Sequence, residues 1–256
     1  MFKTLVIITV IMFSSSTWSI TFGEPSSDHP WLIKVGLCGG ALISNKHILT
    51  AAHCVYDQPP RLITLRRYVE HETSGSVLEY LPKAQNVLVH PEYQSWGTNG
   101  TKLHDIAILT LSKPIQTIEF LALPDNGQVN EPLNISGFGK LENGGYPKFP
   151  QKLAGLEVYP KKEDKDFWSK YLFLLASDDP NQNFEDSFFR GQYGAVQVES
   201  GRSACRGDSG SPVFNNSRPL VLVGLVSHGQ NDCIGQSTFF YTEVFPYLAW
   251  VKEQLK

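Results

Sequence analysis

The sequence is poor in cysteine, with four among 256 residues and no Cys-x-x-Cys pair. Closely spaced cysteine pairs are typical of structural zinc sites, so their absence argues against such a site. An even number of cysteines in a secreted chain favours two disulfides instead. Four cysteines allow three connectivities, and their spacing alone leaves all three open.

The sequence also lacks an apolar run long enough to span a bilayer, which needs about 20 residues. Residues 5–13 are apolar, follow Lys3 and precede small polar residues, a pattern typical of a secretory signal. Cleavage after Ser19 fits this pattern, and cleavage after Ser16 is the alternative. We therefore predict a signal peptide over 1–19 and a secreted, extracellular protein. The competing interpretation of this segment is an N-terminal core strand.

A surplus of positive charge is missing as well, because the net charge of the whole chain is −3. Residues 1–19 carry only Lys3, so the remainder holds 21 basic and 25 acidic residues and a net charge of −4. This balance argues against nucleic acid or an acidic membrane as the main partner.

What the sequence does contain is a series of short apolar segments separated by proline, glycine and asparagine, which predicts an all-β protein. The one strong helical pattern lies at the end, where Leu248, Val251 and Leu255 share a face. Residues 161–192 are irregular and polar. The predicted strands are 31–37, 47–52, 86–90, 106–111, 153–159, 220–227 and 239–244.

Three short stretches contain residues suited to nucleophilic catalysis. "LTAAHC" ends an apolar strand at His53, "HDIAILTL" places Asp105 before a buried strand, and "CRGDSGSP" places Ser209 between glycines. A serine hydroxyl needs a base to accept its proton, and histidine titrates in the right range. A buried carboxylate can orient that histidine.

Each of these residues alone also has an ordinary structural explanation. His53 could be a buried histidine bonded to backbone, Asp105 could cap a turn, and Ser209 could belong to a glycine–serine loop. The three motifs together, in this order, are more specific than any one of them.

In this order the motifs resemble the chymotrypsin-like serine endopeptidases, and the similarity runs from about residue 20 to the C-terminal helix. The resemblance implies two packed six-stranded antiparallel β-barrels with a C-terminal helix. The first barrel would cover about 20–119, and the second barrel with the helix about 120–256. An α/β-hydrolase is disfavoured by the order of the motifs and by Ser211, where its elbow motif needs glycine. Further matching stretches are "CGGALIS" at 38–44, "HPEY" at 90–93, "GFG" at 137–139 and "YTEV" at 241–244.

The resemblance also implies roles for the motif residues. His53 would be the general base, Asp105 its orienting partner, and Ser209 the nucleophile. The amides of Gly207 and Ser209 would form the oxyanion hole. No metal or cofactor is implied.

Two disulfides follow from the same resemblance, Cys38–Cys54 beside the histidine and Cys205–Cys233 near the substrate pocket. It also implies that a new N-terminus at Ile20 pairs with Asp208. Because cleavage after Ser19 would create this terminus directly, we expect no zymogen stage.

The substrate pocket implied by the resemblance has Ser203 at its floor, where an aspartate would select Arg or Lys. Ser227, His228 and Gly229 would form the edge that pairs with substrate. Phe239 falls where a glycine usually lines the wall. If its ring points inward, small or medium apolar side chains are favoured, as in elastase-like enzymes; if it rotates away, the preference is chymotrypsin-like. Tryptic specificity is not expected.

Asn-x-Ser/Thr sequons make Asn99, Asn134 and Asn215 candidates for glycosylation. The expected partners are protein or peptide substrates and protein inhibitors, and we expect a monomer. The alternative from another class is a secreted serine-protease homologue that binds partners without catalysis. The complete set of motif residues favours the enzyme.

Overall fold

The structure is a computed structural model that describes most of the chain outside the N-terminus and several loops. The described residues are 20, 23–26, 29–71, 75–96, 101–116, 119–129, 132–158, 193–197, 202–229 and 238–256. The predicted signal peptide (1–19), the irregular segment 161–192, Asn99 and Cys233 lie outside these residues.

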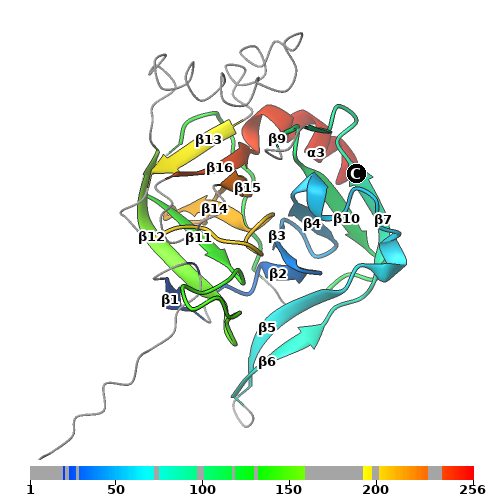
Figure 1. Cartoon of the computed structure of the whole chain (residues 1–256). Helices are drawn as coiled ribbons and strands as arrows, with labels where there is room; N and C mark the ends of the chain where they lie inside the picture. Colours follow the sequence, from blue (N-terminus) through cyan, green and yellow to red (C-terminus); the bar gives the residue numbers. More distant parts are fainter. Residues whose placement is uncertain are drawn as a thin grey trace, which may run out of the picture.

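The first of two large antiparallel sheets is built from the N-terminal half of the chain (Figure 1). Its strand order is β6-β5-β2-β3-β4-β10-β7. The strands are β2 (Leu32–Val35), β3 (Cys38–Leu42), β4 (His47–Thr50), β5 (Leu65–His71), β6 (Gly75–Tyr80), β7 (Ala84–Val89) and β10 (Ala107–Leu111).

The second sheet has the order β1-β12-β11-β14-β15-β16-β13, and β13 pairs back onto β12. Six of its strands therefore close into a ring, and β1 adds to β12. The strands are β1 (Glu24–Pro25), β11 (Leu133–Gly137), β12 (Gln151–Val158), β13 (Tyr193–Gln197), β14 (Pro212–Asn215), β15 (Leu222–Gly229) and β16 (Thr238–Glu243).

This architecture confirms the predicted all-β class with two packed sheets and a C-terminal helix. Each sheet has seven described strands where six were predicted, because β6 returns as a hairpin on β5 and β1 joins β12. The strand predicted at 106–111 corresponds to β10, which pairs with both β4 and β7. Four of its five residues are buried, which explains why its sequence is apolar without alternation.

The two ends of the chain each cross to the opposite sheet (Figure 1). Near the N-terminus, Glu24 of β1 pairs with Lys152 of β12 in the second sheet. At the C-terminus, a 3₁₀ turn (η4, Phe245–Tyr247) leads into helix α3 (Leu248–Gln254). Val251 of α3 is fully buried in a cluster made largely of first-sheet residues. These crossings hold the two sheets in one relative position.

An aromatic contact continues this core between the sheets. Trp31 meets Phe214 of β14 edge-on, with ring centroids 4.7 Å apart. His29 lies 4.7 Å from the Trp31 ring, and its Nδ1 is 2.7 Å from the hydroxyl of Ser136 in β11. The interface is therefore apolar in its centre, and the polar atom of His29 at its edge has a partner.

Short elements complete the described chain. No helix in the described part is long and apolar enough to cross a membrane. The remaining elements are the hairpin β8 (Gln94–Trp96) and β9 (Thr101–Leu103) and the 3₁₀ turns η1 (Ala52–Cys54) and η2 (Pro60–Leu62).

Two of the three glycosylation candidates are buried, which corrects the expectation for them. Asn134 is fully buried and donates from its side-chain amide to Asn216 Oδ1 at 2.8 Å. Asn215 is 3% exposed, and its Oδ1 accepts from Val221 N–H at 3.2 Å. A glycan must leave the surface at the side-chain nitrogen, so neither site is accessible in the folded chain.

Candidate active site

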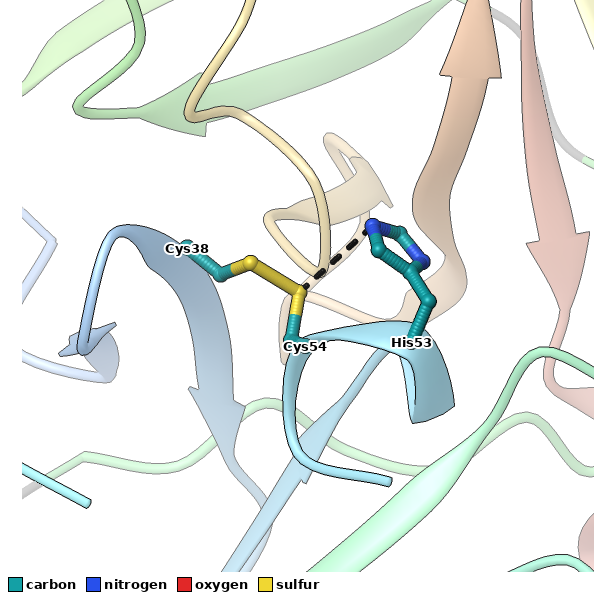
Figure 2. A group of neighbouring side chains, drawn as sticks. All are labelled: Cys38, His53 and Cys54. Atoms are coloured by element: carbon teal, nitrogen blue, oxygen red, sulfur yellow. Dashed lines mark hydrogen bonds between the residues drawn. A yellow bond between two sulfur atoms is a disulfide. The ribbon is translucent and has the colours of Figure 1, made fainter. Parts of the chain in front are cut away.

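His53 is held between a buried strand and a disulfide. Strand β4 places Ile48 and Leu49 in the core, and the chain then turns through η1, which contains His53. A disulfide from Cys54 to Cys38 ties η1 to the start of β3 (Figure 2). The imidazole lies beside this disulfide, with Nε2 3.7 Å from Cys54 Sγ.

The Asp105 carboxylate holds the other side of the imidazole. His53 Nδ1 lies 2.8 Å from Asp105 Oδ2, and the backbone N–H of His53 donates to Oδ1 at 2.9 Å. Ser227 on β15 donates its hydroxyl to Oδ2 at 2.6 Å. Asp105 itself is fully buried. Donors from both sheets therefore surround one carboxylate.

These donors set the charge of Asp105. Burial by itself would raise the pKa of Asp105, but attraction to His53 and hydrogen bonds from His53 and Ser227 outweigh it and hold the pKa below its ordinary value. An ionised carboxylate only accepts hydrogen bonds, so the His53 proton lies on Nδ1. The lone pair of Nε2 is then available to accept a proton.

The sequence predicted only part of the role of Ser227. The resemblance placed it only at the edge that pairs with substrate, whereas its hydroxyl bonds to Asp105. No local motif reveals this contact, because the two residues lie 122 positions apart.

Ser209 lies in a tight turn between two glycines with positive φ, Gly207 (+99°) and Gly210 (+76°). A Cβ on Gly210 would come within 2.3 Å of Thr50 Oγ1 and 2.5 Å of Gly39 O. Only glycine fits there, on conformational and steric grounds. The turn is anchored to the first sheet because Gly39 N–H donates to Ser209 O at 2.8 Å.

This turn brings Ser209 toward His53 without a direct hydrogen bond between them in the described residues. Gly210 packs against Thr50 and Ala51, just before the turn that carries His53. The backbone N–H groups of Gly207 and Ser209 have no partner in the described part of the chain. Two such free donors beside a serine can bind a developing oxyanion.

Asp208 turns inward from the same loop and is fully buried. Its carboxylate accepts from Gly139 N–H at 2.7 Å and from Cys205 N–H at 2.8 Å. Burial raises the pKa of Asp208 to about 7, although the two backbone donors and the Lys34 ammonium act to lower it.

The predicted partner of Asp208, Ile20, is buried elsewhere in this chain, in which residue 19 still precedes it. Its side chain belongs to a cluster in the second sheet with Ala204, Phe239 and Tyr241. No bond joins Ile20 to Asp208 among the described residues. The pairing therefore stays a prediction for a chain that begins at Ile20.

The other predicted pocket residues occupy the second sheet. Ser203 and Phe239 are fully buried, whereas Gly229 is exposed at the end of β15. The His228 ring stacks on Phe240, with centroids 5.0 Å apart. Burial, with a smaller contribution from the Lys102 ammonium, lowers the pKa of His228 to about 3, so this ring is neutral.

The second predicted disulfide is described only at one end. Cys205 is disulfide-bonded. Cys233 lies outside the described residues, so the pairing Cys205–Cys233 stays a prediction.

Removing the Ser227 hydroxyl should destabilise the chain in a pH-dependent way. The pKa of folded Asp105 is depressed, so its hydrogen bonds stabilise the fold above the ordinary carboxyl pKa and are lost as pH falls through the folded pKa. We expect Ser227→Ala to lower the free energy of unfolding by about 1.5–3 kcal/mol at pH 7, since the lost bond is to a charge.

Denaturant unfolding from pH 7 down to pH 3 measures this effect. The difference from wild type should shrink as pH falls below about 4. The control is Ser44→Ala, which removes a half-buried hydroxyl that contacts His47. Its loss in free energy of unfolding should not follow this pH trend. A loss for Ser227→Ala that stays constant over the whole range would contradict an ionised Asp105.

Comparisons with known proteins agree with this geometry. The family model described as "Trypsin" matches residues 20–251. "Trypsin Blo t 3" of Blomia tropicalis is 31% identical over 222 residues, covering 84% of this chain and 76% of the relative. "Serine protease snk" of Drosophila melanogaster is 27% identical, covering 92% of this chain and 52% of the relative.

A third relative, "Phenoloxidase-activating enzyme" of Bombyx mori, is 28% identical, covering 93% of this chain and 60% of the relative. The chain thus spans little more than half the length of two of these proteins. The family model nevertheless covers most of the chain. On these grounds the resemblance to chymotrypsin-like proteases is confirmed, and the chain belongs to the trypsin family of serine proteases.

Proposed function

We propose that this chain is a secreted serine endopeptidase that cleaves peptide bonds through an acyl-enzyme. The observation that carries the proposal is the buried, ionised Asp105, which fixes the proton of His53 on Nδ1 and leaves Nε2 as a base. A carboxylate with a purely structural role would not need to hold the His53 proton on Nδ1.

In the proposed reaction, Ser209 Oγ attacks the scissile carbonyl while His53 Nε2 accepts its proton. The N–H groups of Gly207 and Ser209 stabilise the oxyanion that forms. His53 then donates the proton to the leaving amine, and water hydrolyses the acyl-enzyme by the same steps. Asp105 stays ionised and stabilises the imidazolium throughout.

One observation favours the alternative, a homologue that binds without cleaving. His53 Nε2 faces Cys54 Sγ at 3.7 Å, and Ser209 has no hydrogen bond to it among the described residues. Such bonds are often long or absent in a protease without substrate, so this geometry does not outweigh the orientation of His53 by Asp105.

A fluorophosphonate probe separates the two functions because it labels only an activated serine. We expect labelling of the secreted wild-type chain and complete loss of labelling in Ser209→Ala. Ser211→Ala, which removes a buried hydroxyl two residues away, should keep it. An unlabelled wild-type chain under every processing condition would support the binding homologue.

We also propose that a chain beginning at Ile20 pairs its α-ammonium with Asp208. The support is the raised pKa of Asp208 in the chain that retains residues before Ile20, where burial outweighs the help from Lys34. An ammonium beside this carboxylate would favour its ionised form and hold the Ser209 turn.

The pH dependence of stability tests this pairing. In the full chain, the pKa of Asp208 rises from 3.8 to about 7 on folding. Its contribution to stability is therefore present below about pH 4 and lost as pH rises to about 7, by a few kcal/mol. Relative to Asp208→Asn, which does not titrate, the full wild-type chain should lose stability from pH 5 to pH 8.

In a chain that begins at Ile20, this loss should disappear, because the ammonium lowers the pKa of Asp208. Denaturant unfolding of both forms measures the trend, and Asp57→Asn, at an exposed acid, is the control. The same loss of stability in both forms would contradict the pairing.

For specificity, we propose cleavage after small or medium apolar residues. Ser203 at the predicted pocket floor has no charge to attract Arg or Lys. Phe239 is fully buried in one cluster with Ala204, the residue that follows Ser203. A benzyl group packed there shortens the space left for a substrate side chain.

Phe239→Ala should therefore enlarge the pocket. We expect kcat/KM for peptides with Phe or Tyr before the cleaved bond to rise at least tenfold relative to peptides with Ala or Val, about 1.4 kcal/mol in transition-state binding. A peptide library with Phe245→Ala as a control, at an exposed aromatic after β16, makes the measurement. Unchanged preference, or cleavage mainly after Arg, would refute the proposed pocket.

A further inference from the structure

Three side chains of the kind that bind transition metals gather beside the first sheet. His90 follows β7, Glu92 lies in the next turn, and His104 follows β9. One ligand atom from each lies within 4.8 Å of the other two. In the described residues the other such group is Cys38, His53 and Cys54, but its cysteines are joined in a disulfide and cannot act as thiolate ligands.

The spacing of these groups is close to what a single zinc ion needs. His104 Nε2 lies 4.0 Å from Glu92 Oε2, and the rings of His90 and His104 stack with centroids 5.1 Å apart. Ligands with bonds of about 2.0–2.2 Å in a tetrahedral site are about 3.3 Å from one another. The Glu92 side chain is 69% exposed and can turn inward. The planes of the two rings differ by only 10°, so one ring must also rotate before both face a single ion.

Neighbouring aromatic residues pack around the two imidazoles. The Tyr247 hydroxyl lies 3.3 Å from His104 Nδ1, the nitrogen that faces away from Glu92. Tyr247 and Trp250 each meet the His90 ring edge-on at 5.0 Å. Of these contacts, the one from the Tyr247 hydroxyl is of the kind that orients a metal-binding histidine.

The charge of the cluster also suits a cation. A neutral imidazole keeps one lone pair that can bind a metal. Glu92 has no Lys or Arg partner in the described part of the chain. Two neutral imidazoles and one carboxylate give a net negative site that is open to solvent on the Glu92 side.

We propose that His90, Glu92 and His104 bind a divalent transition metal of the zinc class, with water in the remaining position. Two histidines and one glutamate are a ligand set that zinc accepts, whereas calcium requires oxygen ligands. The family resemblance implied no metal, and no local spacing motif in the sequence joins these three residues.

The site is coupled to Asp105 through the backbone. His104 directly precedes Asp105 and has a φ of +51°. Its carbonyl accepts from Ile106 N–H at 2.7 Å across Asp105. A metal that draws His104 toward Glu92 therefore acts on the segment that positions Asp105 against His53.

Isothermal titration calorimetry with Zn²⁺ tests the site directly, in the Ser209→Ala background to prevent self-cleavage. Glu92→Gln removes the charge of an exposed side chain, and His104→Asn replaces the imidazole with a residue that tolerates positive φ, so both should fold. We expect each to weaken zinc binding at least tenfold. Glu119→Gln and His47→Asn, an exposed acid and a half-buried histidine outside the cluster, should bind as the parent does.

Binding is measured without proteolysis, so the result does not depend on the proposed function. Calcium in large excess should not displace zinc. Absence of zinc binding at 100-fold excess over protein, or a zinc affinity that is unchanged in Glu92→Gln, would overturn the proposal. The second outcome would place the bound zinc at other histidines.

Discussion

The candidate site depends on one buried charge, the carboxylate of Asp105. The cost of burying this charge away from solvent is offset by three hydrogen bonds, two donated by His53 and one by Ser227. His53 and Asp105 both adjoin strands of the first sheet and Ser227 lies on β15 of the second, so the Ser227 bond forms only when the sheets are packed together. The proton position on His53, and with it the basicity of Nε2, follows from this arrangement.

The packing that holds the sheets together also positions the site. Trp31 and Phe214 meet in the core between the sheets, and the chain ends cross over as β1 and α3. The Ser209 turn is also fastened to the first sheet through Gly39. Ser209, His53 and Asp105 are therefore placed by separate elements that share one interface.

The sequence predicted the elements that have a recognisable local pattern, such as an apolar run or a short motif. Apolar runs located β10 and the helix containing Val251, and the motifs around His53, Asp105 and Ser209 identified the family. The β5–β6 hairpin was missed because charged residues such as Arg66, which is half-buried, and Glu79, which is exposed, interrupt its apolar positions. The Ser227–Asp105 bond and the His90–His104 stack could not be predicted, because no local sequence motif joins the residues in either pair.

The central claim is that Asp105 is ionised and fixes the His53 proton on Nδ1. Nitrogen-15 NMR of the imidazole rings, with His53 assigned by comparison with His53→Ala, measures this directly. At pH 8 the account predicts a His53 ring with a protonated Nδ1, hydrogen-bonded and slow to exchange, and an unprotonated Nε2. A ring protonated on Nε2, or one that exchanges rapidly between the two forms, would contradict it.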